Sequence, residues 1–244
     1  MSSYIEGATL VVGADSDIGT ELIKTIRGNI IAHYYISKDK IEDISDEDKN
    51  ITAVFGDLST TKGIEDFIES VKECQKPILR IVHLPASQAN PSRITKFDPE
   101  RFHKEMNIQV VSAALISKEF LPAMVKGRYG RVAIVLTSYC IGVPPKYMTE
   151  YVSVKYALMG LMKSLAVEFA GKGITVNAVA PSMVDTKFLS SLPEFEIAAN
   201  AKGNPMGRNA LPKDIVHILK ILLEEETEYM TGTVIPITGG ASFF

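Results

Sequence analysis

Three side chains between Ser138 and Lys155 could together move a proton to or from an alcohol oxygen. Tyr151 follows Ser138 by thirteen residues, and Lys155 follows Tyr151 by four. Residues four apart share one face of a helix, so the phenol and the ammonium can meet at one small cavity. A free phenol has a pKa of about 10, and a nearby ammonium favours its ionised form. The Ser138 hydroxyl can hold the substrate oxygen against the phenol.

The stretch around these residues resembles the classical short-chain dehydrogenase/reductase family. Between residues 130 and 186 the matching features are a serine after a hydrophobic strand (IVLTS), the YxxxK pair, the phrase GITVNAVAP and a threonine five residues past Pro181. The similarity covers residues 8–240 and is closest in character to the 3-oxoacyl-acyl-carrier-protein reductases. It implies that Asn107, in the phrase MNIQV, holds a water that links Lys155 to solvent.

The composition is that of an ordinary globular chain. Of 244 residues, 46% are hydrophobic and 23% are charged, and the net charge of −3 gives no basic footprint for nucleic acid. Two cysteines are too few for a disulfide framework. No apolar run approaches the length of a membrane span, and Glu6 interrupts any secretory leader. We therefore expect a cytoplasmic protein that binds neither membrane nor nucleic acid.

Short apolar segments rich in β-branched residues alternate with amphipathic ones along the chain. Strands are predicted at 8–12, 29–35, 51–55, 78–84, 131–137, 174–179 and 233–237, with helices at 20–27, 61–73, 99–125, 151–170 and 212–225. This alternation predicts an α/β protein with a parallel sheet covered by helices on both faces. We expect one doubly wound Rossmann domain over 1–244, and the resemblance implies the strand order 3-2-1-4-5-6-7. The charged run 38–50 is predicted to be a solvated surface segment.

The first strand is followed by the turn Gly13-Ala14-Asp15-Ser16-Asp17-Ile18-Gly19. A doubly wound fold brings such a turn to the pyrophosphate of a dinucleotide. Asp17 stands where the family pattern GxxxGxG has its middle glycine, and its carboxylate could cap the helix. The resemblance places the adenine at Asp57 and Leu58 and the nicotinamide carboxamide at Val184 and Thr186. The cofactor-binding residues expected on these grounds are Gly13, Ser16, Asp17, Ile18, Gly19, Asp57, Leu58, Ala86, Tyr151, Lys155, Pro181, Val184 and Thr186.

The end of the second strand bears on the form of the cofactor. It carries no carboxylate before Asp39, although NAD-selective sites place an acid there for the ribose 2′-OH. Ser37 and Lys38 could donate to a 2′-phosphate instead. Asp15 and Asp17 in the glycine turn argue against NADP(H), because their negative charges would repel a 2′-phosphate. We expect NADP(H) to be preferred, with NAD(H) possible, and no metal, because the four histidines lack metal-ligand spacing.

These residues predict an oxidoreductase that moves hydride between a nicotinamide and a carbonyl or secondary alcohol. By resemblance the substrate is a 3-oxoacyl thioester. The alternatives are a polyol, sugar or other secondary-alcohol dehydrogenase, and a non-catalytic nucleotide-binding scaffold, which the altered glycine turn favours. Residues 187–210 are expected to form a substrate lid. Its apolar side chains, which suit an acyl chain, are Phe188, Leu189, Leu192, Phe195 and Met206.

The helices predicted at 99–125 and 151–170 carry more apolar residues than one buried face needs. The resemblance implies that they pair across a two-fold axis. We therefore expect a homo-oligomer, and by resemblance a homotetramer.

Overall fold

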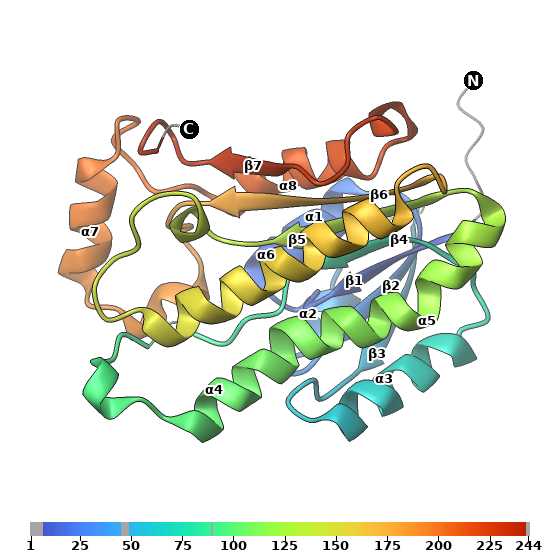
Figure 1. Cartoon of the computed structure of the whole chain (residues 1–244), viewed down its shortest axis with the longest axis horizontal. Helices are drawn as coiled ribbons and strands as arrows, with labels where there is room; N and C mark the ends of the chain where they lie inside the picture. The colour runs from blue at the N-terminus through green and yellow to red at the C-terminus, as the bar shows by residue number, and fades with distance from the viewer. Residues whose placement is uncertain (1–6, 45–48, 89, 243–244) are drawn as a thin grey trace.

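The computed structural model describes residues 7–44, 49–88 and 90–242. Its centre is one seven-stranded parallel sheet in the order β3-β2-β1-β4-β5-β6-β7, which confirms the predicted fold class and strand order. Helices cover both faces (Figure 1). The strands are β1 (Ala8–Val12), β2 (Gly28–Tyr34), β3 (Lys49–Phe55), β4 (Ile78–His83), β5 (Gly130–Val135), β6 (Ile174–Pro181) and β7 (Val234–Ile237).

Each face of the sheet carries its own set of helices and its own apolar cluster. In Figure 1 the long α4–α5 segment and α6 run side by side across the front of the sheet. The helices of this face are α3 (Thr61–Glu73), α4 (Pro99–Met106), α5 (Ser112–Gly127) and α6 (Thr149–Phe169). The other face carries α1 (Asp17–Thr25), α2 (Asp39–Glu42) and α8 (Pro212–Leu222). The segment after β6 forms the 3-10 turn Lys187–Ser191 and α7 (Glu194–Gly203).

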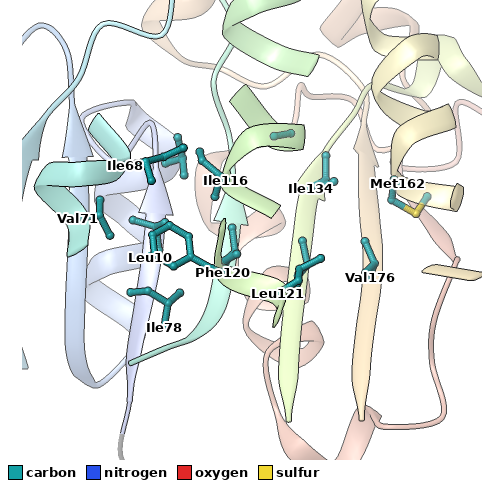
Figure 2. Close-up of a cluster of buried hydrophobic side chains, with 14 of the residues drawn as sticks. Leu10, Ile68, Val71, Ile78, Ile116, Phe120, Leu121, Ile134, Met162 and Val176 are labelled. Carbon is teal, nitrogen blue, oxygen red and sulfur yellow. The ribbon is translucent and has the colours of Figure 1, made fainter. Parts of the chain in front are cut away.

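The larger apolar cluster lies between the sheet and α3, α5 and α6, and it explains why the sequences of the strands are nearly continuous apolar runs. Figure 2 shows Ile116, Phe120 and Leu121 of α5 between side chains of β1 and β5, such as Leu10 and Ile134. All five side chains are buried. A second apolar cluster lies on the opposite face of the sheet. Residues on both faces of the central strands are therefore apolar. The sheet is thereby fixed between two apolar layers.

Two local features differ from the sequence expectation. The helix predicted at 99–125 is interrupted by a π-helical turn at Asn107–Val111. The charged run 38–50 is not wholly solvated, because Ile41 of α2 is buried and β3 already begins at Lys49. Residues 45–48 of that run, and residues 1–6 that bear on a leader, lie outside the described residues.

One helix, Pro99–Gly127, is apolar and long enough to cross a membrane by length and composition. Part of that apolar surface has a clear role, because α5 contributes Ala113, Ile116, Phe120, Leu121 and Met124 to the larger cluster. A helix buried against a sheet passes the same test of composition as a membrane span.

Candidate active site

A cavity of about 1080 Å³ lies at the carboxyl ends of the strands. Parallel strands present these ends at one edge of the sheet, where open α/β folds bind their ligands. A cavity of this volume can hold a dinucleotide with a small substrate beside it. Its wall consists of residues 13, 15–18, 33, 35–37, 40, 56–59, 84–88, 90, 104, 108, 135–137, 139, 148, 151, 155, 181–184, 186–190 and 192.

Tyr151 and Lys155 project from α6 into the cavity, as their i, i+4 spacing predicts. The Lys155 side chain is only 2% exposed, and its Nζ donates to the Val135 carbonyl oxygen at 2.9 Å. That Nζ lies 5.9 Å from the centre of the Tyr151 ring. Burial lowers the pKa of Lys155 to about 8 and raises the pKa of Tyr151 well above its ordinary value. The phenol is therefore protonated at neutral pH and suited to act as an acid.

A hydroxyl beside Tyr151 is that of Thr137, the residue before Ser138. Thr137 lines the cavity, and its hydrogen bond to the phenol opposes the effect of burial on the Tyr151 pKa. Ser138 is buried but does not line the cavity. The backbone gives the reason: Thr137 is still extended, with φ −150° and ψ 149°, and the chain turns into a 3-10 helix at Ser138. The orienting role of Ser138 stays a prediction, and Thr137 is a second candidate for it.

Asn107, expected to hold a relay water, is not part of the cavity wall, and its side chain contacts the backbone. Its Nδ2 donates to the Ser59 carbonyl oxygen at 2.9 Å, in the loop that follows β3. Two residues on, Gln109 is fully buried and its Nε2 donates to Glu105 Oε2 at 2.9 Å. Glu105 is close enough for its charge to raise the pKa values of both Tyr151 and Lys155. Glu105, held by Gln109, is thus a carboxylate of α4 whose charge reaches Tyr151 and Lys155.

The glycine turn has the form that a pyrophosphate site requires. Gly13 has φ +80°, a conformation that favours glycine. A Cβ on Gly19 would lie 2.5 Å from the Gly13 carbonyl oxygen, so glycine there lets α1 approach the turn. The amides of Asp17 and Ile18, at the positive end of α1, have no acceptor within the described part of the chain. Such amides bind phosphate at helix N-termini, so the turn fits a dinucleotide.

Asp17 is not the helix cap that its position suggested. The cap is Ser16, whose Oγ accepts from the Gly19 amide at 3.0 Å. The Asp17 carboxylate instead accepts from the Lys187 amide at 2.6 Å and lies 3.8 Å from the Lys40 Nζ. Two groups thus offset its charge beside the expected phosphates, and it ties the glycine turn to the segment after β6.

That segment closes over the cavity from the side of Tyr151. The Phe188 ring lies 6.1 Å from the Tyr151 ring, and Ser190 Oγ accepts from Gln88 Nε2 at 2.8 Å. Leu189 and Leu192 also line the cavity. Phe195 and Met206, which are 71% and 68% exposed, do not line it.

Two buried histidines hold the backbone around the cavity. His33 Nδ1 accepts from the Gly13 amide at 2.9 Å, and its Nε2 lies 3.0 Å from the Gly56 carbonyl oxygen. His83 Nε2 lies 3.0 Å from the Gln109 carbonyl oxygen, within the π-helical turn. Burial lowers the pKa of both imidazoles. Within the described ranges, no group of three His, Cys, Asp or Glu side chains is placed to hold a metal ion.

Most residues that the sequence assigned to the site do line this cavity. They are Gly13, Ser16, Asp17, Ile18, Ser37, Asp57, Leu58, Ala86, Tyr151, Lys155, Pro181, Val184 and Thr186. Gly19, Lys38, Asn107 and Ser138 are not part of the wall. Lys38 pairs with Glu42 at 2.7 Å on the surface. Sequence reasoning missed Thr137 and Glu105; the second could have been suspected as the one carboxylate in the KEMNIQ phrase.

A cavity large enough for a dinucleotide, lined by a phosphate-binding turn and by a Tyr–Lys pair, is typical of a nicotinamide-dependent oxidoreductase. Comparisons with known proteins agree. Residues 18–242 match the family described as enoyl-(acyl carrier protein) reductase. The chain is 30% identical to the uncharacterized oxidoreductase YmfI of Bacillus subtilis over 243 residues, covering 95% of this chain and 97% of YmfI.

A second relative is the 3-oxoacyl-[acyl-carrier-protein] reductase FabG of Rickettsia felis, 26% identical with 95% of each chain covered. The crystal structure of a 3-oxoacyl (acyl-carrier-protein) reductase from Agrobacterium tumefaciens with NADP bound superposes with a TM-score of 0.83. It is 25% identical, with 96% of this chain and 93% of that chain covered. The protein belongs to the short-chain dehydrogenase/reductase family, and it is an NAD(P)-dependent enzyme of that family.

The burial of Lys155 gives a direct test of the site's electrostatics. In the nucleotide-free protein its ammonium should lose its proton near pH 8, because desolvation disfavours the charged form. The amine is then charged below about pH 8 and neutral above it. NMR of ¹³Cε-labelled lysine, with Lys155→Arg to assign the resonance, measures this titration. A Lys155 resonance that shifts only above pH 10 would contradict the burial.

Proposed function

We propose that this protein reduces a ketone, and oxidises the corresponding secondary alcohol, with Tyr151 as the proton donor and acceptor. The observation that carries the proposal is the Tyr151–Lys155 pair, which lies in one cavity with a hydroxyl at the phenol and a phosphate-binding turn at the far end. The bound nicotinamide supplies or takes the hydride. The side chains of the protein carry out the proton transfers.

In the direction of reduction, the protonated Tyr151 phenol gives its proton to the carbonyl oxygen as that oxygen gains charge. The Thr137 hydroxyl donates a hydrogen bond to the same oxygen and orients it. The Lys155 ammonium, fixed by the Val135 carbonyl, supplies positive charge beside the phenolate that forms. In oxidation the same groups act in reverse. Asn107 as a water-holding relay remains a prediction from the resemblance.

The substrate we propose is a 3-oxoacyl thioester. Supporting this are the apolar side chains of the closing segment, Phe188, Leu189 and Leu192, which line the cavity next to Tyr151. A polyol or sugar would require polar partners at those positions, so the alcohol-dehydrogenase alternative is the weaker one. A non-catalytic scaffold would gain nothing from a buried lysine beside a phenol, so this alternative is also weaker. The segment 187–210 acts as the substrate lid, with residues 187–190 and 192 in the cavity wall.

The experiment that tests the function is turnover of acetoacetyl thioesters against a panel of ketones and polyols, with both nicotinamide nucleotides. Tyr151→Phe should lower the rate by about 10²–10⁴-fold, because it removes the only proposed proton donor. Nucleotide affinity should stay within a few-fold, which shows that the fold is kept. A variant with more than half of the wild-type rate would rule out this mechanism.

Thr137 and Ser138 form a matched pair for the orienting hydroxyl. Thr137→Val keeps the shape of the side chain and removes only the hydroxyl, so kcat should fall by about tenfold or more. Ser138→Ala, one residue along, should change kcat by less than about threefold. Steady-state kinetics of the two variants, with circular dichroism to confirm folding, decide the assignment. The reverse order of effects would restore Ser138 to the site.

We also propose a cytoplasmic homotetramer. On α6, Val167 and Tyr156 are 80% and 44% exposed, and less than half of the apolar window in Pro99–Gly127 is buried. A second copy would cover these faces through an isologous contact, the commonest symmetric arrangement. Light scattering at micromolar concentration should give four times the chain mass of 26.7 kDa. A monomeric mass would overturn the proposal.

A further inference from the structure

The Asp15 carboxylate sits at the end of β2, although Asp15 belongs to the turn after β1. Its Oδ2 accepts from three consecutive backbone amides, those of Tyr35 at 3.2 Å, Ile36 at 2.8 Å and Ser37 at 3.3 Å. Asp15 and these three residues all line the cavity. A carboxylate of the chain itself therefore occupies the strand end where a cofactor ribose is recognised in doubly wound folds.

Three successive N–H groups that converge on one point form an anion-binding nest. Here the nest already holds an anion, and it is the fixed charge of Asp15. The second oxygen, Oδ1, has no hydrogen-bond partner in the part of the chain that the structure describes, so it can accept from a ligand hydroxyl. The nest thus turns Asp15 into a preorganised acceptor that lies in the cavity wall.

The cations nearby are also engaged. Lys38, expected to bind a 2′-phosphate, pairs with Glu42 and lies outside the cavity wall. Lys40 does line the cavity, but its Nζ donates to the Asp15 carbonyl oxygen at 2.8 Å and lies 3.8 Å from the Asp17 carboxylate. A 2′-phosphate would therefore lie near the carboxylates of Asp15 and Asp17. It could not bind the backbone amides of residues 35–37, because these already donate to Asp15.

We infer that Asp15 sets the choice of cofactor, and that it selects NAD(H) over NADP(H). Its carboxylate accepts from the ribose hydroxyls and repels a 2′-phosphate. This inference rests on the proposed function and reverses the preference expected from the sequence. The sequence shows no carboxylate at the end of the second strand itself. In the folded protein Asp15, which belongs to the glycine turn after β1, lies at the end of the neighbouring β2 and supplies the carboxylate there.

The test is direct binding of NADH and NADPH, measured by calorimetry or nucleotide fluorescence without any substrate. Wild type should bind NADH at least about tenfold more tightly than NADPH, because like charges a few ångströms apart repel strongly in a cleft. Asp15→Ser should free the amides, raise NADPH affinity and lower NADH affinity, so that the ratio falls by about tenfold or more. Asp15→Asn, which removes only the charge, should move the ratio in the same direction.

The matched control is Asp43→Asn, which removes an equal charge from an exposed position at the end of α2 and should leave the ratio unchanged. Thermal melts confirm folding, and Asp15→Asn carries the test if the serine variant does not fold. Wild type that prefers NADPH, or Asp15 variants whose ratio stays within twofold of wild type, would overturn the inference. Failure of wild type to bind either nucleotide would instead overturn the proposed function.

Discussion

The site is organised around a buried positive charge. Lys155 is held 2.9 Å from the Val135 carbonyl oxygen at the end of a central strand, with almost no access to solvent. Removing a charge from water is costly unless the protein supplies partners, and here the partner is a main-chain carbonyl of β5. The position of α6 against the sheet therefore sets where the ammonium lies, and with it the position of the phenol one turn earlier.

The same edge of the sheet brings together groups that are far apart in the sequence. His33 joins the ends of β1, β2 and β3 through its two ring nitrogens. Asp17 connects the glycine turn to Lys187, and Gln88 connects the loop after β4 to Ser190. The glycine turn and the segment after β6 are therefore joined by a hydrogen bond. The nucleotide end and the substrate end of the cavity belong to one connected site.

Sequence reasoning succeeded where a feature is periodic or local. Strand order, the two apolar layers and the Tyr151–Lys155 pair follow from apolar alternation, family phrases and i, i+4 spacing. Loop geometry is harder to predict. The chain turns into a 3-10 helix at Ser138, so Thr137 and not Ser138 lines the cavity, and the Asn107 amide, in the π-helical turn Asn107–Val111, donates to the Ser59 carbonyl oxygen. The hydrogen bond from the Ile36 amide to Asp15 joins the ends of two neighbouring strands, and a sequence pattern does not reveal such a contact.

The two buried histidines make the protein sensitive to acid. Each is neutral in the fold, with a pKa lowered by burial from 6.5, in the case of His83 to about 3. The unfolded chain binds these protons first, so stability falls as the pH drops below about 6.5. Protonated His33 would present an N–H to the Gly13 amide that it now accepts from. Proton uptake by His33 therefore acts on the glycine turn itself, at the nucleotide end of the cavity.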